Sequence, residues 1–187
     1  MSRPREGAIL PLVLKAGRPV FVLVAICLVA SVLLALVNAL TAPVIADAAR
    51  ERAQATYRSL MPDAARFEEV PCEVEGVTTA LRALDATGAP IGYVVVAEAQ
   101  GYGGELPIAV SFFLDGSVGS IVAMDNEETP GLGKRVAEPD FSDQFVGRPA
   151  EEVALADVDT ISGATISSKA YVLAFNRAIE AYQEVQG

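Results

Sequence analysis

The sequence contains no histidine, and only two of its 187 residues are cysteine. Without histidine, neither a Ser-His-Asp nor a Cys-His nucleophilic arrangement can form. Cys27 lies inside a long apolar run and Cys72 stands alone after it. We therefore expect no intrachain disulfide, no Cys/His metal site and no iron–sulfur cluster.

Basic residues are also scarce, because 14 Lys and Arg stand against 24 Asp and Glu and give a formal net charge of −10. Binding to nucleic acid or to anionic lipid headgroups requires basic patches, so this balance argues against both. No G-x-G-x-x-G follows a predicted strand, and the chain is not expected to bind NAD itself. The excess of acidic residues is expected mainly to keep the exported part soluble.

One long apolar run is present near the N-terminus. From Val20 to Leu40 no residue is charged, and Asn38 is the only strongly polar one. At about 1.5 Å per residue, this run spans the roughly 30 Å hydrocarbon core of a bilayer. A cleaved signal peptide is the alternative, but its apolar region is normally about 7–15 residues long. The sequence predicts a transmembrane helix at 19–41.

The charges that flank this run predict its orientation. Four basic residues and one acidic residue precede it: Arg3, Arg5, Lys15, Arg18 and Glu6. The residues that follow are of mixed sign, so the positive-inside rule keeps segment 1–18 in the cytoplasm. We expect a single-pass protein of the cell inner membrane, with the rest of the chain on the periplasmic side.

The exported part begins with segment 42–62, which is rich in Ala, Arg and Glu and predicts a helical stalk. The pattern from there to residue 89 is mixed, and strands in it are not placed. Apolar, β-branched residues at 91–100 predict a buried strand, and alternation on both sides of Asp115-Gly116 predicts a hairpin.

Apolar residues recur at helical spacing between Tyr171 and Tyr182, which predicts an amphipathic C-terminal helix. Together these patterns indicate an α+β domain at 63–187, a twisted antiparallel sheet with packed helices. About 125 residues suffice for a core that partly encloses a cofactor.

Residues 159–170, DTISGATISSKA, place an acid, a Ser-Gly-Ala-Thr turn and further hydroxyls before that helix. Thr165 lies at or just before the helix N-terminus, where unpaired N–H groups and the helix dipole favour a phosphate. The plainer interpretation is that Ser162 or Thr165 only caps the helix.

Two further glycine-rich loops carry the same ambiguity, GYGG at 101–104 and ETPGLG at 128–133. Each is ordinarily a turn, but a backbone without Cβ can also approach a flat heterocycle closely. Three such loops in one small domain favour a ligand site.

With these motifs the chain resembles the FMN-binding domain family, whose flavinylation signature D-x-x-[ST]-G-A-T is matched by DTISGAT. GYGG, the Asp-Gly hairpin, ETPGLG and QFVG also occur in the order that the family shows. Within the family, the chain is most similar to the G-type subunit of Rnf-type ion-translocating ferredoxin:NAD oxidoreductase complexes. The C-type subunit of sodium-translocating NADH:quinone reductases is the alternative.

The resemblance implies an FMN joined to Thr165 by a phosphoester bond and installed by a separate flavin transferase that uses FAD. It also implies that four neighbouring residues either support Thr165 or are recognised together with it, namely Asp159, Ser162, Gly163 and Ala164. The residues that it implies around the flavin are Glu128, Thr129, Pro130, Gly131, Leu132, Gly133, Tyr102, Gly103 and Gly104.

The chain would then be a redox subunit, not catalytic alone, that relays electrons in a membrane complex coupling ferredoxin–NAD electron transfer to ion translocation. Its partners would be the other membrane and peripheral subunits. A quinone-reducing complex, a stand-alone reductase and a flavin-free assembly subunit remain as alternatives. Asn126 departs from the family, because many G-type sequences have histidine at this position, so no imidazole role is carried over.

Overall fold

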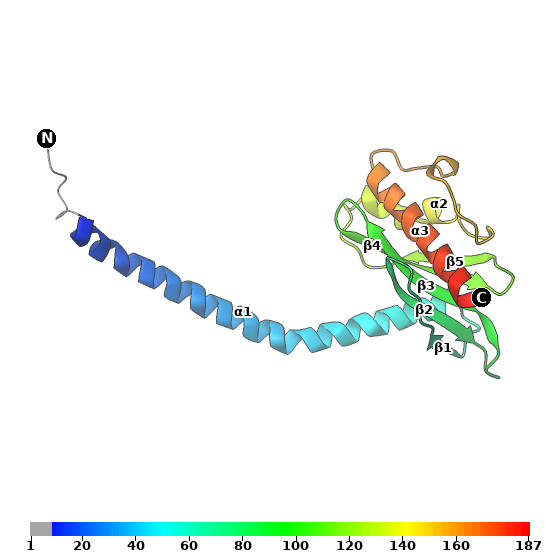
Figure 1. Ribbon diagram of the computed structural model, residues 1–187, viewed down its shortest axis with the longest axis horizontal. Helices are drawn as coiled ribbons and strands as arrows, with labels where there is room; N and C mark the ends of the chain where they lie inside the picture. The colour runs from blue at the N-terminus through cyan, green and yellow to red at the C-terminus, as the bar shows by residue number, and fades with distance from the viewer. Residues whose placement is uncertain (1–8) are drawn as a thin grey trace. The chain divides into compact units, whose positions relative to one another are not determined.

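The computed structural model describes residues 9–187, and the chain divides into two compact units between Arg52 and Ala53. Helix α1 (Ile9–Leu60) extends from the first unit into the second (Figure 1). It has no break at residue 42, so the boundary between the predicted membrane span and the predicted stalk stays a prediction.

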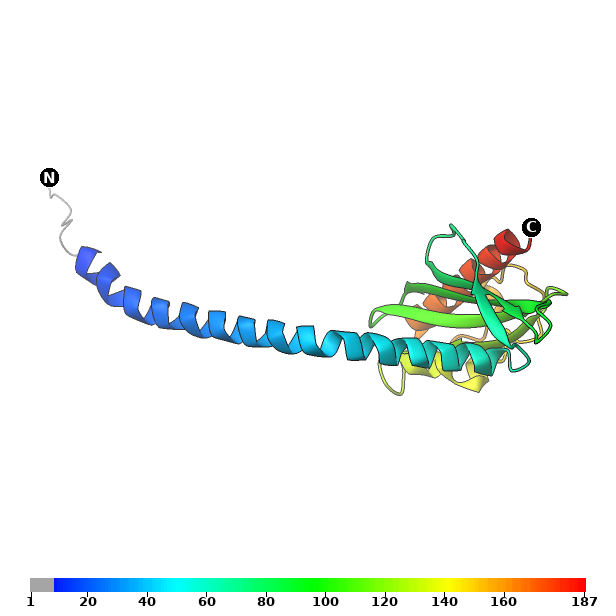
Figure 2. The same cartoon turned by 90° about the horizontal axis from the view of Figure 1, so that it is seen from below.

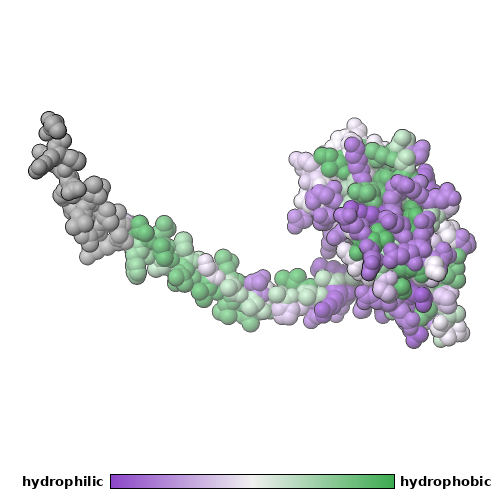
Figure 3. Space-filling model, viewed as in Figure 1, coloured by the Kyte–Doolittle hydropathy of each residue, from purple (hydrophilic) through white to green (hydrophobic). Residues whose placement is uncertain are grey.

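Apolar side chains dominate the part of α1 that follows Pro19. Residues 19–46 are all exposed, and Figure 3 shows this stretch mostly in the colour of hydrophobic residues. Within the described chain, α1 is the one helix long and apolar enough to cross a membrane, by length and composition alone. The charges on which the predicted orientation depends, at residues 3–18, lie outside the described side chains.

The second unit contains a five-stranded antiparallel sheet in which neighbours in the chain are neighbours in space. Its strands are β1 (Arg66–Glu69), β2 (Val77–Leu84), β3 (Pro90–Gln100), β4 (Glu105–Phe113) and β5 (Val118–Ala123). Short helices η2 (Gly133–Ala137), α2 (Pro139–Ser142) and η3 (Leu155–Asp157) lie before the long helix α3 (Thr165–Gln186). The predicted α+β fold class, with an antiparallel sheet and packed helices, is confirmed.

Both faces of the sheet carry buried residues, because α3 packs along one face and the last turns of α1 meet a smaller core on the other (Figure 2). Along β3, Tyr93, Val95 and Ala97 belong to the core that α3 completes, whereas Val94 and Val96 belong to a smaller core beneath the end of α1. This division follows from the alternation of side chains along a strand. It explains why the segment that contains β3 is apolar without a break.

The predicted Asp-Gly hairpin joins β4 to β5. The carboxylate of Asp115 accepts hydrogen bonds from the backbone N–H of Ser117 at 2.9 Å and from its hydroxyl at 2.6 Å. These bonds lower the pKa of Asp115. Gly116 has a φ of +84°, a conformation that glycine adopts without a steric cost.

Tyr171 of α3 is fully buried among aromatic rings. Its ring centroid lies 5.2 Å from that of Phe141 and 5.3 Å from that of Phe145. The hydroxyl has no hydrogen-bond partner among residues 9–187, and burial raises the pKa of this group far above its usual value. A buried hydroxyl without a partner is destabilising.

We therefore expect Tyr171→Phe to stabilise the domain by about 1 kcal/mol at neutral pH, since the variant removes an unpaired buried group at constant shape. Above pH 10.0, the usual pKa of tyrosine, only the unfolded wild type loses this proton, so wild-type stability falls with rising pH. The advantage of the variant should widen there. Denaturant titrations at neutral and alkaline pH measure both effects, and a destabilised variant would contradict them.

Candidate functional site

A cavity of about 450 Å³ opens beside the N-terminus of α3. Its wall takes residues from the β3–β4 loop, from the segment between β5 and η2, and from the turn that enters α3. All three glycine-rich loops singled out in the sequence therefore meet at one place, although Tyr102 and Ser167 are 65 positions apart in the chain. The volume lies within the range of about 300–1,000 Å³ that is usual for small-molecule sites.

The cavity wall contains most of the predicted site residues. Those in the wall are Tyr102, Glu128, Thr129, Leu132, Gly133, Gly163, Ala164 and Thr165. Those outside it are Gly103, Gly104, Pro130, Gly131, Asp159 and Ser162. Flavin binding by any of these residues stays a prediction.

Two residues of the wall, Ile166 and Ser167, were not predicted from the sequence. Both follow Thr165 directly in DTISGATISSKA. Ser167 could have been predicted from its position, because its hydroxyl lies two residues after Thr165, in the first turn of the predicted helix. The first turn of a helix presents all three of its residues near the same terminus, so a ligand at Thr165 also approaches Ser167.

Thr165 is the first residue of α3, and its side chain is exposed. The N-cap residue is Ala164, which has no side-chain capping hydrogen bond. Neither Ser162 nor Thr165 caps the helix, so the plainer interpretation of this motif is wrong. Within residues 9–187, no hydrogen bond involves the hydroxyl of Thr165, which is left free in the cavity wall.

The turn before Thr165 is held by a residue from inside the helix. The hydroxyl of Ser168 donates to the backbone O of Ala164 at 3.0 Å and accepts from the backbone N–H of Ile161 at 3.2 Å. Gly163, with a φ of +82°, supplies the left-handed residue of this turn. Ser168 thus stabilises the turn before α3, as the side chain of an N-cap residue otherwise would.

Asp159 is held through its backbone rather than through its carboxylate. The N–H of Asp159 donates to Gln144 Oε1 at 2.8 Å, and Gln144 Nε2 donates back to the O of Asp159 at 3.3 Å. Gln144 begins the QFVG motif, so this motif fixes the start of the DTISGAT segment. The Asp159 side chain is exposed and lies outside the cavity wall.

Glu128 is the most buried charged residue of the site, with 2% of its surface exposed. Its Oε1 accepts hydrogen bonds from the backbone N–H of Tyr102 at 2.8 Å and of Gly103 at 3.3 Å. Its Oε2 accepts from the hydroxyl of Ser167 at 2.7 Å. One side chain therefore joins the β3–β4 loop and the first turn of α3 to the segment that follows β5.

Close approach to this carboxylate explains two of the glycines. A Cβ at Gly101 would collide with Glu128 Oε1, and a Cβ at Gly133 would collide with Glu128 Oε2. Asn126 fixes the backbone beside them, because its Nδ2 donates to the O of Met124 at 2.8 Å and its Oδ1 accepts from the N–H of Glu128 at 3.1 Å. Asn126 thus has a structural role at the position where the resemblance led us to expect histidine.

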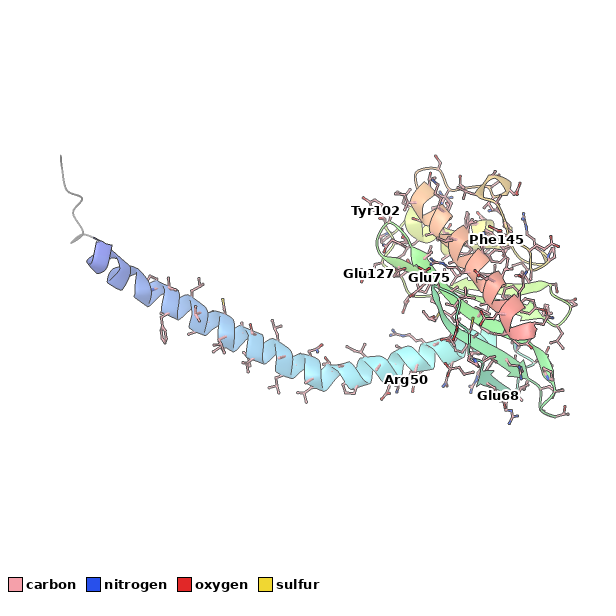
Figure 4. All side chains as sticks on the ribbon, in the orientation of Figure 1. Arg50, Glu68, Glu75, Tyr102, Glu127 and Phe145 are labelled. Carbon is pink, nitrogen blue, oxygen red and sulfur yellow. The ribbon has the colours of Figure 1, made fainter. Side chains whose placement is uncertain are left out.

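Exposed apolar side chains line the mouth of the cavity. Tyr102 is 70% exposed, Ile166 52% and Leu132 40%. Tyr102 lies on the loop that joins β3 and β4 (Figure 4). Together they offer apolar and aromatic surface of the kind that binds a flat aromatic ring.

The hydrogen bond between Ser167 and Glu128 can be tested by removing its donor. We expect Ser167→Ala to destabilise the flavin-free chain by about 1.5–3 kcal/mol, because a buried carboxylate loses a charge-assisted bond. Ser162→Ala is the matched control, since Ser162 is exposed and outside the wall, and it should change stability by less than about 0.5 kcal/mol. Equal stabilities of the two variants, measured by denaturant unfolding, would contradict the role given to Glu128.

Comparison with protein families matches residues 101–180 to the FMN-binding domain. This range begins at the GYGG loop and ends inside α3, so it includes every residue of the cavity wall. The matched range does not include β1, β2 or β3, and it begins at the loop that follows β3.

Two curated relatives, each the subunit designated G of its complex, extend the similarity over most of the chain. The relative from the ion-translocating oxidoreductase complex of Methanosarcina acetivorans is 33% identical over 175 residues, which cover 88% of this chain and 93% of the relative. The relative from the Na⁺-translocating ferredoxin:NAD⁺ oxidoreductase complex of Acetobacterium woodii is 31% identical over 196 residues, covering 92% and 93%.

Among solved structures, the crystal structure of the C-type subunit of Na⁺-translocating NADH-quinone reductase from Parabacteroides distasonis is similar to this chain. The TM-score is 0.48 at 25% sequence identity, and the similarity covers 58% of this chain and 62% of that one.

Proposed function

This chain belongs to the family of G-type subunits of ion-translocating oxidoreductase complexes, and we propose that it relays electrons through an FMN esterified to Thr165. It would act as a redox subunit of such a complex and would not catalyse a reaction alone. Its partners would be the other membrane and peripheral subunits. A flavin transferase, with FAD as donor, would install the cofactor during maturation.

The free hydroxyl of Thr165 carries this proposal. It lies on the first residue of α3, in the wall of a cavity of about 450 Å³, and no described residue occupies it with a hydrogen bond. The residue also lies inside the range that matches the FMN-binding domain. The turn before α3 is held by Ser168, so the hydroxyl of Thr165 takes no part in it.

The residues around Thr165 fit a phosphate ester. The backbone N–H of Ser168 makes the first hydrogen bond of α3, to the O of Ala164 at 2.9 Å. The N–H groups of Thr165, Ile166 and Ser167 precede it and have no helical acceptor. They would donate to phosphate oxygens, and the helix dipole would favour the negative charge there.

The remaining wall fits an isoalloxazine ring. Tyr102, Leu132 and Ile166 would cover its apolar surface and exclude water from it, while the hydrogen bonds of Glu128 hold the β3–β4 loop and the first turn of α3 in fixed positions. Bound FMN supplies one- and two-electron redox chemistry, for which the protein provides position and electrostatics. The tether to Thr165 removes the entropy cost of association from every cycle.

Attachment needs no base from this chain if the transferase activates the hydroxyl, which agrees with the absence of histidine. Outside the cytoplasm, a covalent bond would also prevent loss of the cofactor by dilution. We propose the membrane span at 19–41 between a cytoplasmic segment 1–18 and a stalk at 42–62, with the FMN domain, 63–187, on the periplasmic side of the cell inner membrane. The exposed apolar side chains of α1 support the membrane span in this proposal.

Thr165→Val tests the attachment site directly. When each chain is produced together with a flavin transferase, wild-type protein should show flavin fluorescence that survives denaturing electrophoresis, and Thr165→Val should show none. Thr160→Val is the matched control, because Thr160 is exposed in the same segment but outside the cavity wall, and it should keep the full signal.

Folding of the variants is checked in the same preparations. Thr165 is exposed and makes no side-chain hydrogen bond to any described residue, so Thr165→Val should change stability by less than about 0.5 kcal/mol. Covalent flavin in a folded Thr165→Val protein would refute the assignment of this residue.

A further inference from the structure

Glu128 is buried without a cation beside it. Its exposed fraction is 2%, and among the described residues no Lys or Arg forms an ion pair with its carboxylate. The three groups that contact its carboxylate are two backbone N–H groups and one hydroxyl, which are neutral donors. Neutral donors orient a carboxylate and stabilise it, but they add no opposite charge to cancel its own.

This carboxylate lies in the wall of the proposed flavin cavity. Interactions between charges are stronger in a protein interior than in water, because the effective dielectric constant is lower. Water also screens an exposed acid such as the adjacent Glu127, and it cannot reach Glu128 to the same extent. Of the two neighbouring acids, only Glu128 can act strongly on a group inside the cavity.

We propose that the negative charge of Glu128 holds the reduction potential of the attached FMN low. The inference rests on the proposed function, since it requires FMN in this cavity. Two-electron reduction of the neutral isoalloxazine takes up two electrons and one proton and leaves one negative charge on the ring. A fixed negative charge in the wall opposes that added charge, so the oxidised flavin is favoured and the bound cofactor becomes a stronger reductant.

Glu128→Gln removes this charge and keeps the hydrogen bonds. The amide oxygen can accept from the backbone N–H groups of Tyr102 and Gly103, as Oε1 does, and the amide nitrogen can donate to the hydroxyl of Ser167. Glu127→Gln is the matched control, because it removes the same charge one residue earlier from an exposed side chain (Figure 4).

The experiment is a redox titration of the full chain carrying covalent FMN, with dithionite as reductant and flavin absorbance as the readout. The FMN content of each protein is first measured by mass. At a fixed potential, Glu128→Gln should raise the ratio of reduced to oxidised flavin about tenfold, which is about 30 mV for a two-electron couple. Glu127→Gln should change the ratio by less than about threefold, because water and salt screen that charge.

Glu128→Asp separates the charge from the hydrogen bonds, because it keeps the carboxylate but is one methylene too short to reach all three donors. It should lower the melting temperature and leave the potential near that of the wild type. An increase in potential as large as that of Glu128→Gln would show that hydrogen-bond geometry sets the potential and would overturn the proposal.

Other outcomes separate the two proposals. If the wild type carries FMN and Glu128→Gln titrates at the same potential, the charge has no such effect and only this inference fails. If Glu128→Gln does not fold or take up FMN while Glu128→Asp does both, the charge serves the fold and the inference is likewise overturned. A wild type without FMN, despite an active transferase, would refute the proposed function itself.

Discussion

The hydrogen bonds to the carboxylate of Glu128 determine the shape of the candidate site. They tie the β3–β4 loop and the first turn of α3 to one residue, and the distances of 2.7 and 2.8 Å to Ser167 and Tyr102 leave little freedom for either segment. Gly101 and Gly133 follow from the same constraint, because any side chain at either position would displace the carboxylate. The cavity exists because these segments are held together without filling the space between them.

The sheet and α3 provide the rigid frame for that arrangement. Tyr171, Phe175 and Tyr182 of α3 are buried in the core shared with the sheet. The first residue of α3 therefore has a fixed position relative to the strands. The loops that meet it leave the ends of β3 and β5, strands that belong to the same sheet. A free hydroxyl on Thr165 is thus positioned by long-range packing, while the local turn is held by Ser168.

Much of this could be predicted from the sequence, because the signals were local. The helical spacing of apolar residues predicts α3. The turn preference of Asp115-Gly116 predicts the β4–β5 hairpin. Strand β1, Arg66–Glu69, could not be placed, since an edge strand with three charged residues of four shows no apolar alternation. Recognition of the G-type family rested on the order of several short motifs, and it is confirmed by the relatives.

The contacts inside the site could not be predicted from the sequence, because they join residues far apart in the chain. ETPGLG predicts a turn with glutamate at its start, but nothing in it indicates that the Glu128 side chain turns inward to Ser167, 39 residues later. Gln144 was noticed only as part of a motif, and its clamp on the backbone of Asp159 requires the fold. The alternative interpretation, a helix cap at Ser162 or Thr165, is wrong because Ser168 holds that turn from inside the helix.

Peptide mass of the protein from its own membranes tests the central claim most directly. Trypsin cleaves after Arg135 and Lys169, while Pro149 protects the bond after Arg148, so Thr165 lies in the peptide 136–169. The account predicts that this peptide gains the mass of FMN less one water, and that fragmentation places the addition on Thr165. An unmodified peptide from cells with an active flavin transferase, or an FMN on another residue, would contradict it.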